Sequence, residues 1–192
     1  MEYPEERYKY KIITIPNILS FFRLCLIPLI LWQYVGEKNY CNALYLLVLS
    51  GLTDIVDGII ARKFHMISDL GKALDPVADK LTQIVVLFCL VTRFPSMWIP
   101  LILLLVKEIF AGITGLMMVK RGTVIGADWH GKVTTVLLYG TMLAHLAWFN
   151  ISATVSNVLI ALCTGMILLS GVLYGVRNLR FLSSGGTHHG KN

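Results

Sequence analysis

Apolar residues occur along this chain in long blocks rather than in the alternation that is typical of half-buried β-strands. An α-helix needs about 20 mainly apolar residues to cross the hydrocarbon core of a bilayer, and the blocks approach that length. The pattern therefore predicts an all-α integral membrane protein with six transmembrane helices. The six blocks cover residues 15–35, 42–62, 72–91, 97–119, 133–149 and 155–173.

Composition and charge agree with this prediction and orient the chain. Of the 192 residues, 56% are hydrophobic and 15% charged, and the mean hydropathy is +0.69. With a cytoplasmic N-terminus, twelve basic residues fall on the cytoplasmic side and only Lys38 and Arg93 on the other. This bias predicts two cytoplasmic termini in a cell-membrane protein. The net charge of +6 then reflects topology and attraction to anionic membrane lipids, with no nucleic-acid partner. The twelve are Arg7, Lys9, Lys11, Arg62, Lys63, Lys72, Lys120, Arg121, Lys132, Arg177, Arg180 and Lys191.

The blocks are interpreted as one six-helix membrane domain over residues 15–180. Residues 1–14 precede it as an interfacial segment with aromatic and basic anchors. Residues 181–192 are polar and rich in Ser, Gly and His, and we expect them to form a flexible tail. The four cysteines are scattered without C-x-x-C spacing, which favours apolar filling over a disulfide framework or a zinc site.

One polar stretch stands out: DIVDGIIARKFHMISDLGKALDPVAD, residues 54–79, holds five aspartates. Asp54 and Asp57 are three residues apart and Asp75 and Asp79 are four apart, so each pair shares one face of a helix. The bend between the two helices lets these faces turn toward each other. Four carboxylates in a low-dielectric site would repel one another, and a hard divalent cation such as Mg²⁺ or Mn²⁺ removes that repulsion.

Other interpretations of the aspartates stay open at this point. They could be ordinary charges at helix ends, although four acids at helical spacing inside apolar segments favour a functional site. The chain could also be a divalent-metal carrier, but it shows no repeated halves and its acids lie near one face. Asp69 stands apart, and we expect it to be solvated or to cap a helix.

The residues around the aspartates fit an anionic substrate. Gly58 and Gly71 would let a ligand approach the backbone closely, with helix packing as the alternative for each. Arg62 and Ser68 fall on the cytoplasmic rim, where they could grip a diphosphate.

The motif as a whole resembles a known family signature. Starting at residue 54, it reads D-x2-D-G-x2-A-R-x8-G-x3-D-x3-D, which is similar to the complete signature of the CDP-alcohol phosphotransferase family. All eight signature positions are filled, and the six predicted spans extend the resemblance over nearly the whole chain. The segments IPNILSFFRL, residues 15–24, and LDPVADK, residues 74–80, resemble the phosphatidylglycerophosphate synthase and cardiolipin synthase branch.

This resemblance implies an enzyme that joins a CDP-activated lipid to an alcohol and releases CMP at the cytoplasmic face. It further implies that two Mg²⁺ or Mn²⁺ ions are bridged by Asp54 and Asp75. Asp57 would complete the first ion site, while Asp79 would touch the second ion and act as the general base. The CDP moiety of CDP-diacylglycerol would be held by Gly58, Arg62, Ser68 and Gly71, with Asn17 to Ser20 closing over it. The family also implies a homodimer.

The acceptor alcohol is indicated less directly. Lys107 lies inside the fourth block, where a cation needs a cavity or a partner. In the phosphatidylglycerophosphate synthases that this branch includes, an Arg-Glu pair stands at a comparable place, and this chain has Lys107-Glu108. An internal pairing of these two side chains is the alternative. Lys132 and Arg23 are each either a phosphate ligand or a membrane anchor. We predict glycerol 3-phosphate as acceptor, with a cardiolipin-synthase-type enzyme acting on phosphatidylglycerol as the alternative.

Overall fold

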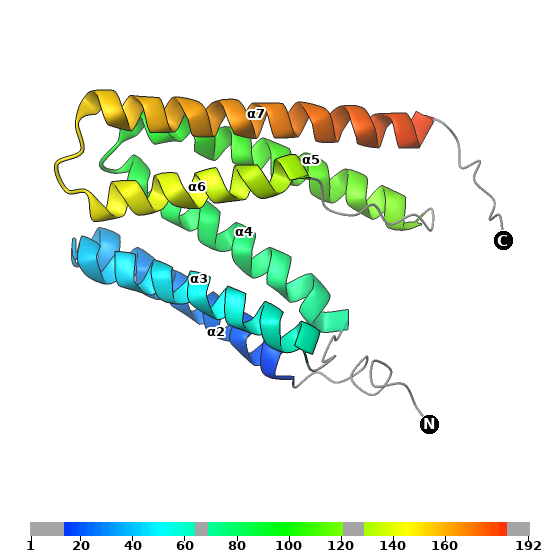
Figure 1. The fold of residues 1–192 in the computed structure, drawn as a ribbon, viewed down its shortest axis with the longest axis horizontal. Coiled ribbons are helices and arrows are strands. Elements are labelled where there is room, and N and C mark those ends of the chain that lie inside the picture. Colours follow the sequence, from blue (N-terminus) through cyan, green and yellow to red (C-terminus); the bar gives the residue numbers. More distant parts are fainter. Residues whose placement is uncertain (1–13, 64–68, 121–128, 184–192) are drawn as a thin grey trace. The chain divides into compact units, whose positions relative to one another are not determined.

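The computed structural model describes residues 14–63, 69–120 and 129–183, and this part of the chain is all-α (Figure 1). It contains six α-helices and two short segments of π- and 3₁₀-helix. The chain divides into two compact units. Unit 1 comprises Met1–Arg93 with Leu146–Phe149, and unit 2 comprises Phe94–His145 with Asn150–Asn192. The elements are α2 (Ile15–Leu31), η1 (Trp32–Gly36), α3 (Tyr40–Lys63), α4 (Asp69–Val91), η2 (Pro95–Met97), α5 (Trp98–Lys120), α6 (Trp129–Ala147) and α7 (Ala153–Ser183).

Unit 1 is built on a hairpin of α2 and α3, with α4 packed along α2. Helix α2 begins at Thr14, whose hydroxyl accepts a hydrogen bond from the Asn17 backbone N–H at 3.4 Å. At the far end of the hairpin, Lys38 takes a left-handed backbone conformation with φ 52°, and the Asn39 side chain accepts from the Asn42 N–H at 3.1 Å. The chain therefore reverses there, and the two helices run antiparallel. The buried apolar side chains of unit 1 include Leu26 and Ile30 of α2, Ala43 and Leu47 of α3, and Ala78 and Leu87 of α4.

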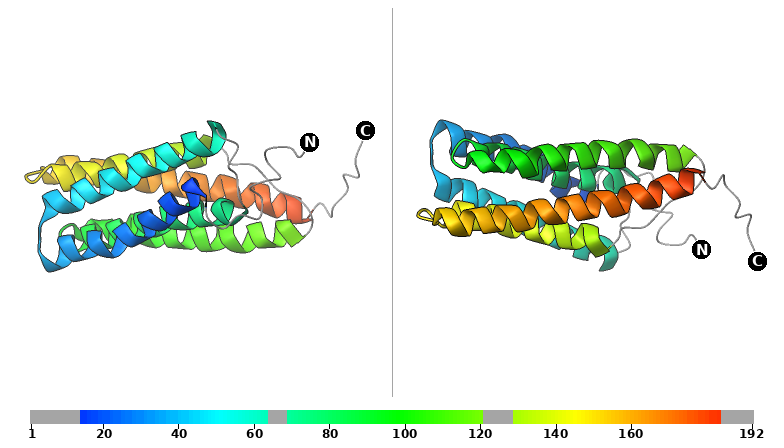
Figure 2. Two further views of the ribbon diagram at one scale, coloured as in Figure 1. Left: turned by 90° about the horizontal axis from the view of Figure 1, so that it is seen from below. Right: turned by 90° about the horizontal axis from the view of Figure 1, so that it is seen from above.

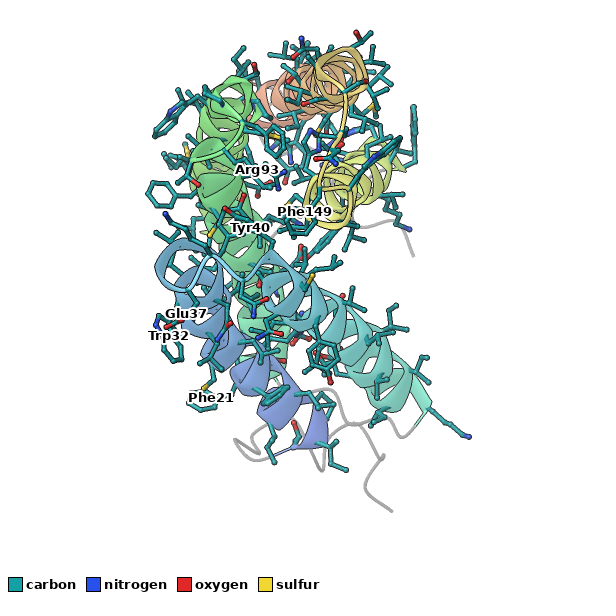
Figure 3. The ribbon with its side chains drawn as sticks, turned by 90° about the vertical axis from the view of Figure 1, so that its left-hand side faces the viewer. Phe21, Trp32, Glu37, Tyr40, Arg93 and Phe149 are labelled. Carbon is teal, nitrogen blue, oxygen red and sulfur yellow. The ribbon has the colours of Figure 1, made fainter. Side chains whose placement is uncertain are left out.

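The end of unit 1 near this turn is held by aromatic rings around Arg93. The Arg93 guanidinium lies 5.2 Å from the ring centre of Tyr40 and 5.3 Å from that of Phe149, and it donates to the Phe149 carbonyl (Figure 3). Tyr34 packs edge-on against Tyr40 with ring centres 4.8 Å apart. These contacts tie the short Leu146–Phe149 segment to the hairpin turn.

Unit 2 contains α5, α6 and α7, and its helices are joined by hydrogen bonds between buried polar side chains. Figure 2 shows α5 and α7 running side by side. Asn178 of α7 donates to Thr114 of α5 at 2.8 Å, and His130 of α6 lies 3.0 Å from the Ser170 hydroxyl of α7. Small polar residues at such positions let helices approach closely while their polar groups are satisfied.

The outward faces of the helices are strongly apolar. Side chains such as Phe21, Leu116 and Val136 are more than 60% exposed, as expected for surfaces in contact with lipid. Four segments are long and apolar enough to span a membrane: Ile15–Gly36, Tyr40–Ala61, Pro95–Met117 and Ala153–Leu179. Helix α4 carries Asp75 and Asp79 with two lysines, and α6 has His130 and Lys132 in its first turn, so neither is among these four segments. The protein is an integral membrane protein with these four candidate spans.

Candidate functional site

Three of the four predicted metal-ligand aspartates come together in unit 1, and they meet around a residue of α2. The guanidinium of Arg23 pairs with Asp54 through Nη1. Its Nη2 lies 2.9 Å from Asp57 Oδ2 and 3.2 Å from Asp75 Oδ1. The carboxylates of α3 and α4 therefore face each other, as the spacing of the motif predicts.

The local sequence explains this convergence. Asp54 and Asp57 lie in the C-terminal half of α3, whereas Asp75 lies in the N-terminal third of α4, and Arg23 contacts all three at one end of unit 1. On α2, Ser20 and Arg23 are three residues apart and face the same side. The buried Ser20 hydroxyl lies 2.9 Å from the Pro16 carbonyl and close to Asp75 Oδ1, and its single proton can serve either acceptor.

Burial differs sharply across the site. The side chains of Arg23 and Asp57 are only 2% and 4% exposed, whereas those of Asp54 and Asp75 are 50% and 40% exposed. Arg23 and Asp57 thus form the closed side of the cluster, and Asp54 and Asp75 form its open side. A charged ligand that arrives from the surface meets the open side first.

Asp79 lies one helical turn beyond Asp75 and is partly buried. Its Oδ2 accepts a hydrogen bond from the Gln83 side chain at 2.9 Å. Its negative charge is close enough to Asp54 to repel that carboxylate, as the charge of Asp75 also does. Asp79 therefore belongs to the same electrostatic site without pairing with Arg23 in any described contact.

The donor set fits a hard divalent cation in its chemistry, because it consists of carboxylate oxygens that converge from two helices. Within the described ranges, no three acidic, histidine or cysteine side chains surround one point with the geometry of a metal site. The reason is visible in the contacts of the carboxylates: the guanidinium of Arg23 stands at the point where they meet.

The predicted CDP-diacylglycerol ligands are placed in part. Asn17, Ser20 and Gly71 are buried in unit 1, and Gly58 is half-buried one residue after Asp57. Ser68 lies outside the described residues, and the structure describes only the backbone of Arg62. The structure thus places Asn17 and Ser20 on the helix that carries Arg23, next to the acidic cluster.

The two predicted acceptor ligands lie in unit 2. Lys107 is 13% exposed, and its Nζ lies 2.7 Å from Glu108 Oε1, so the internal pairing considered as an alternative is formed. Adjacent helical residues point about 100° apart, but both side chains are long enough to bend toward each other. Lys132 is exposed in the first turn of α6.

The sequence left one central residue undecided. Arg23 was assigned to either a membrane anchor or a phosphate ligand, and the structure makes it the partner of three carboxylates. The sequence does indicate that Arg23 has an acidic partner, because a single arginine inside an apolar helix requires a counter-charge. Gln83 was not singled out, although one turn separates it from Asp79.

Comparison with known proteins identifies the family. The family model described as CDP-alcohol phosphatidyltransferase matches residues 13–171. The CDP-diacylglycerol–glycerol-3-phosphate 3-phosphatidyltransferase of Aquifex aeolicus is 33% identical over 175 residues, covering 88% of this chain and 98% of that protein. The CMP-forming cardiolipin synthase of Streptomyces coelicolor is 32% identical over 184 residues, covering 90% and 86%. A second glycerol-3-phosphate 3-phosphatidyltransferase, from Rickettsia bellii, is 36% identical over 97 residues, or 50% of this chain and 54% of that protein.

The fold and the site thus define a class of protein: an all-α membrane protein with a carboxylate cluster at one end of its first helices. The chain belongs to the CDP-alcohol phosphatidyltransferase family. It is an enzyme of phospholipid synthesis, and its family implies CDP-diacylglycerol and an alcohol acceptor as substrates. The metal-carrier interpretation is set aside. The relatives include both glycerol-3-phosphate transferases and a cardiolipin synthase at similar identity.

Proposed function

We propose that this enzyme transfers the phosphatidyl group of CDP-diacylglycerol to glycerol 3-phosphate and releases CMP. The observation that carries the proposal is the meeting of Asp54, Asp57 and Asp75 in one cluster, at the spacing of the family signature. Similarity to the Aquifex aeolicus transferase over 98% of that protein supports glycerol 3-phosphate as the acceptor.

In the proposed reaction, the hydroxyl oxygen of the acceptor attacks the phosphorus that carries the diacylglycerol. A new O–P bond forms, and the bond from that phosphorus to the oxygen of the CMP phosphate breaks, so that CMP leaves with the electron pair. Asp79 accepts the proton of the attacking hydroxyl. Its position suits this role, because Asp79 lies one helical turn beyond Asp75, beside the acidic cluster.

Asp54, Asp57, Asp75 and Asp79 are the residues that we propose to hold two Mg²⁺ or Mn²⁺ ions. When bound, such ions neutralise the diphosphate and the negative charge that develops on the departing CMP. Gly58, Arg62, Ser68 and Gly71 would contact the CDP moiety, with Asn17 and Ser20 covering it from α2.

The proposal includes a topology. Helices α4 and α6 would cross the membrane together with the four candidate spans, which gives six spans and leaves both termini in the cytoplasm. The acidic cluster would then lie at the cytoplasmic face of the cell membrane, within one membrane domain over residues 15–180 that assembles as a homodimer. Asp75 of α4 pairs with Arg23, which supports counting α4 as a span.

The test is CMP release by the purified protein in detergent, with CDP-diacylglycerol and one acceptor at a time. We expect release with glycerol 3-phosphate, loss of activity in EDTA, and recovery when Mg²⁺ or Mn²⁺ is restored. Full activity in EDTA would contradict the metal proposal. Omitting the acceptor controls for hydrolysis of CDP-diacylglycerol.

A cardiolipin-synthase-type reaction is the second candidate, and the Streptomyces coelicolor relative favours it. In that reaction the hydroxyl of phosphatidylglycerol would replace that of glycerol 3-phosphate as the attacking group. The same assay decides between them. Release of CMP with phosphatidylglycerol but not with glycerol 3-phosphate would establish the second candidate and refute the first.

A further inference from the structure

The acidic cluster of unit 1 contains a cation of its own. The guanidinium of Arg23 is almost fully buried and contacts one oxygen each of Asp54, Asp57 and Asp75. An arginine side chain keeps its charge at any pH that a protein withstands. In this arrangement each of the three carboxylates therefore has a positive charge beside it.

The contacts indicate that the carboxylates set the orientation of this guanidinium. Both terminal nitrogens are used for ion pairs, whereas the buried Nε–H has no hydrogen-bond partner among the residues that the structure describes. Asp75 Oδ1 is shared between Nη2 and the Ser20 hydroxyl, so α2 provides two neighbouring donors to the same oxygen. Helix α2 thus supplies a fork that joins α3 to α4 through their acids.

Removing the guanidinium would leave the three carboxylates facing one another in a partly buried site. With one charge on each group, the cluster carries three negative charges and one positive charge, so its net charge would change from −2 to −3. A divalent cation offers the same compensation as Arg23 and needs the same oxygens. Two cations that use the same carboxylates oppose each other's binding, and the opposition is reciprocal.

We propose that Arg23 is the fixed counter-cation of the acidic cluster. It holds Asp54, Asp57 and Asp75 together when no divalent ion is bound, and it competes with a divalent ion for their oxygens. Arg23 is a positioning residue in this account, because it acts through the carboxylates. The inference rests on the metal-binding part of the proposed function, and it adds that the affinity for the metal is set partly by a residue of α2.

The experiment compares the full-length wild type with Arg23→Met in detergent. Unfolding is followed in EDTA and in Mn²⁺, and free Mn²⁺ is measured directly by electron paramagnetic resonance. In EDTA we expect Arg23→Met to melt on the order of 5–10 °C lower than the wild type. We expect its Mn²⁺ affinity to rise by about tenfold or more, since a positive charge has been removed from the site. Its melting temperature should accordingly rise further on adding Mn²⁺.

Two variants serve as controls. Arg93→Met removes an equally large cation from the other end of unit 1, where it contacts Tyr40 and Phe149, and should leave the Mn²⁺ affinity unchanged. Arg23→Lys keeps the charge without the fork, so its melting temperature in EDTA and its Mn²⁺ affinity should lie between those of the wild type and Arg23→Met.

If Arg23→Met fails to fold, the double variant Arg23→Met/Asp57→Asn should restore folding by removing one of the repelling charges. Equal loss of folding in both would overturn the counter-charge account.

The outcomes separate this inference from the function on which it rests. Metal-dependent CMP release by the wild type, together with unchanged or weaker Mn²⁺ binding by Arg23→Met, would overturn the inference alone. Absence of Mn²⁺ binding in both proteins would overturn the inference together with the metal part of the proposed function. Tighter Mn²⁺ binding by Arg23→Met supports both.

Discussion

At the scale of single residues, we propose two different chemical roles for the four aspartates. Asp54, Asp57 and Asp75 pair with a cation, whereas Asp79 accepts a hydrogen bond from the neutral Gln83 amide. The converging oxygens of Asp54, Asp57 and Asp75 suit the binding of a divalent cation, which would compete with Arg23 for them. Asp79 lies one helical turn beyond Asp75, beside this cluster, and that position suits the proton transfer that we propose for it.

This division predicts different losses for two variants. Asp79→Asn should lower CMP release by about 100-fold to 10,000-fold, because the amide cannot accept the hydroxyl proton, while CDP-diacylglycerol still binds. Asp54→Asn should weaken metal-dependent binding of CDP-diacylglycerol as well. CMP release and calorimetric titration with CDP-diacylglycerol measure the two quantities. Glu37→Gln, an exposed acid at the hairpin turn, is the control and should change neither. Equal loss of binding in both aspartate variants would remove the distinction.

Lys107 tests the acceptor. Its pairing with Glu108 at 2.7 Å means that a substrate phosphate would join or displace an existing partner rather than meet an isolated charge. We expect Lys107→Met to raise the KM for glycerol 3-phosphate by about tenfold or more, with a much smaller effect on the KM for CDP-diacylglycerol. Lys107→Arg should retain much of the activity. Steady-state kinetics with each substrate varied in turn provides the measurement.

Glu108→Gln is the matched variant for this prediction. If the pair is only structural, Lys107→Met and Glu108→Gln should lower the melting temperature similarly and leave the KM for glycerol 3-phosphate unchanged. If Lys107 binds the phosphate, only Lys107→Met should raise that KM. Unchanged glycerol 3-phosphate kinetics in Lys107→Met would place the phosphate site elsewhere.

At the scale of helices, unit 2 is held together by polar contacts as well as by apolar packing. The contact between Asn178 and Thr114 joins α7 to α5, and both side chains are at most 4% exposed. Interhelical hydrogen bonds in membrane proteins contribute about 0.6 kcal/mol on average and up to about 1.7 kcal/mol. Burial on both sides puts this contact toward the upper part of that range, because water cannot replace the lost partner.

A double-mutant cycle with Thr114→Ala and Asn178→Ala checks this expectation. Unfolding free energies in detergent should show a coupling of about 1 kcal/mol between the two positions. The cycle of Thr114→Ala with Thr135→Ala, whose hydroxyl bonds within its own helix α6, should show a coupling near zero. Equal coupling in the two cycles would mean that the hydrogen bond between Asn178 and Thr114 adds nothing of its own to the unfolding free energy.

The helices were predictable from the sequence because the bilayer imposes a minimum apolar length. All six predicted blocks coincide with α-helices of the structure. The prediction was weakest where a helix continues into polar sequence: α7 runs to Ser183, ten residues beyond the predicted block. The length of an apolar block reflects the thickness of the hydrocarbon core, whereas the hydrogen bonds of a helix can continue into the polar sequence beyond it.

The candidate site was predictable only as far as local spacing determines it. The shared faces of Asp54 and Asp57 follow from helical geometry, and these two acids do meet Asp75. The place of Arg23 depends on how α2 is rotated against α3 and α4, with at least 31 residues separating the partners, and no local pattern encodes that. The pairing of Lys107 with Glu108 depends on side-chain bending, which helical periodicity does not describe.

At the scale of the whole molecule, the distribution of basic residues predicts which end of unit 1 faces the cytoplasm. The acidic cluster and the hairpin turn near Lys38 lie at opposite ends of α3. If twelve basic residues are cytoplasmic, then the cluster opens to the cytoplasm and Cys41, exposed in the first turn of α3, lies on the other side. The cytoplasmic location that we propose for the site thus rests on the distribution of basic residues, which lie mostly outside the site.

Labelling with a membrane-impermeant maleimide tests this topology. One variant keeps Cys41 as its only cysteine, with Cys25, Cys89 and Cys163 replaced by alanine. A second also carries Cys41→Ala and adds Lys191→Cys in the C-terminal tail. We expect Cys41 to be labelled in intact cells and position 191 only after the membrane is permeabilised, because the other eleven basic residues predicted to be cytoplasmic keep the orientation fixed. CMP release by each variant confirms that the protein is folded. Labelling of position 191 in intact cells would place the C-terminus outside the cell. The acids of α3 and α4 would then open to the outside, and this result would contradict a site that takes CDP-diacylglycerol from the cytoplasmic side.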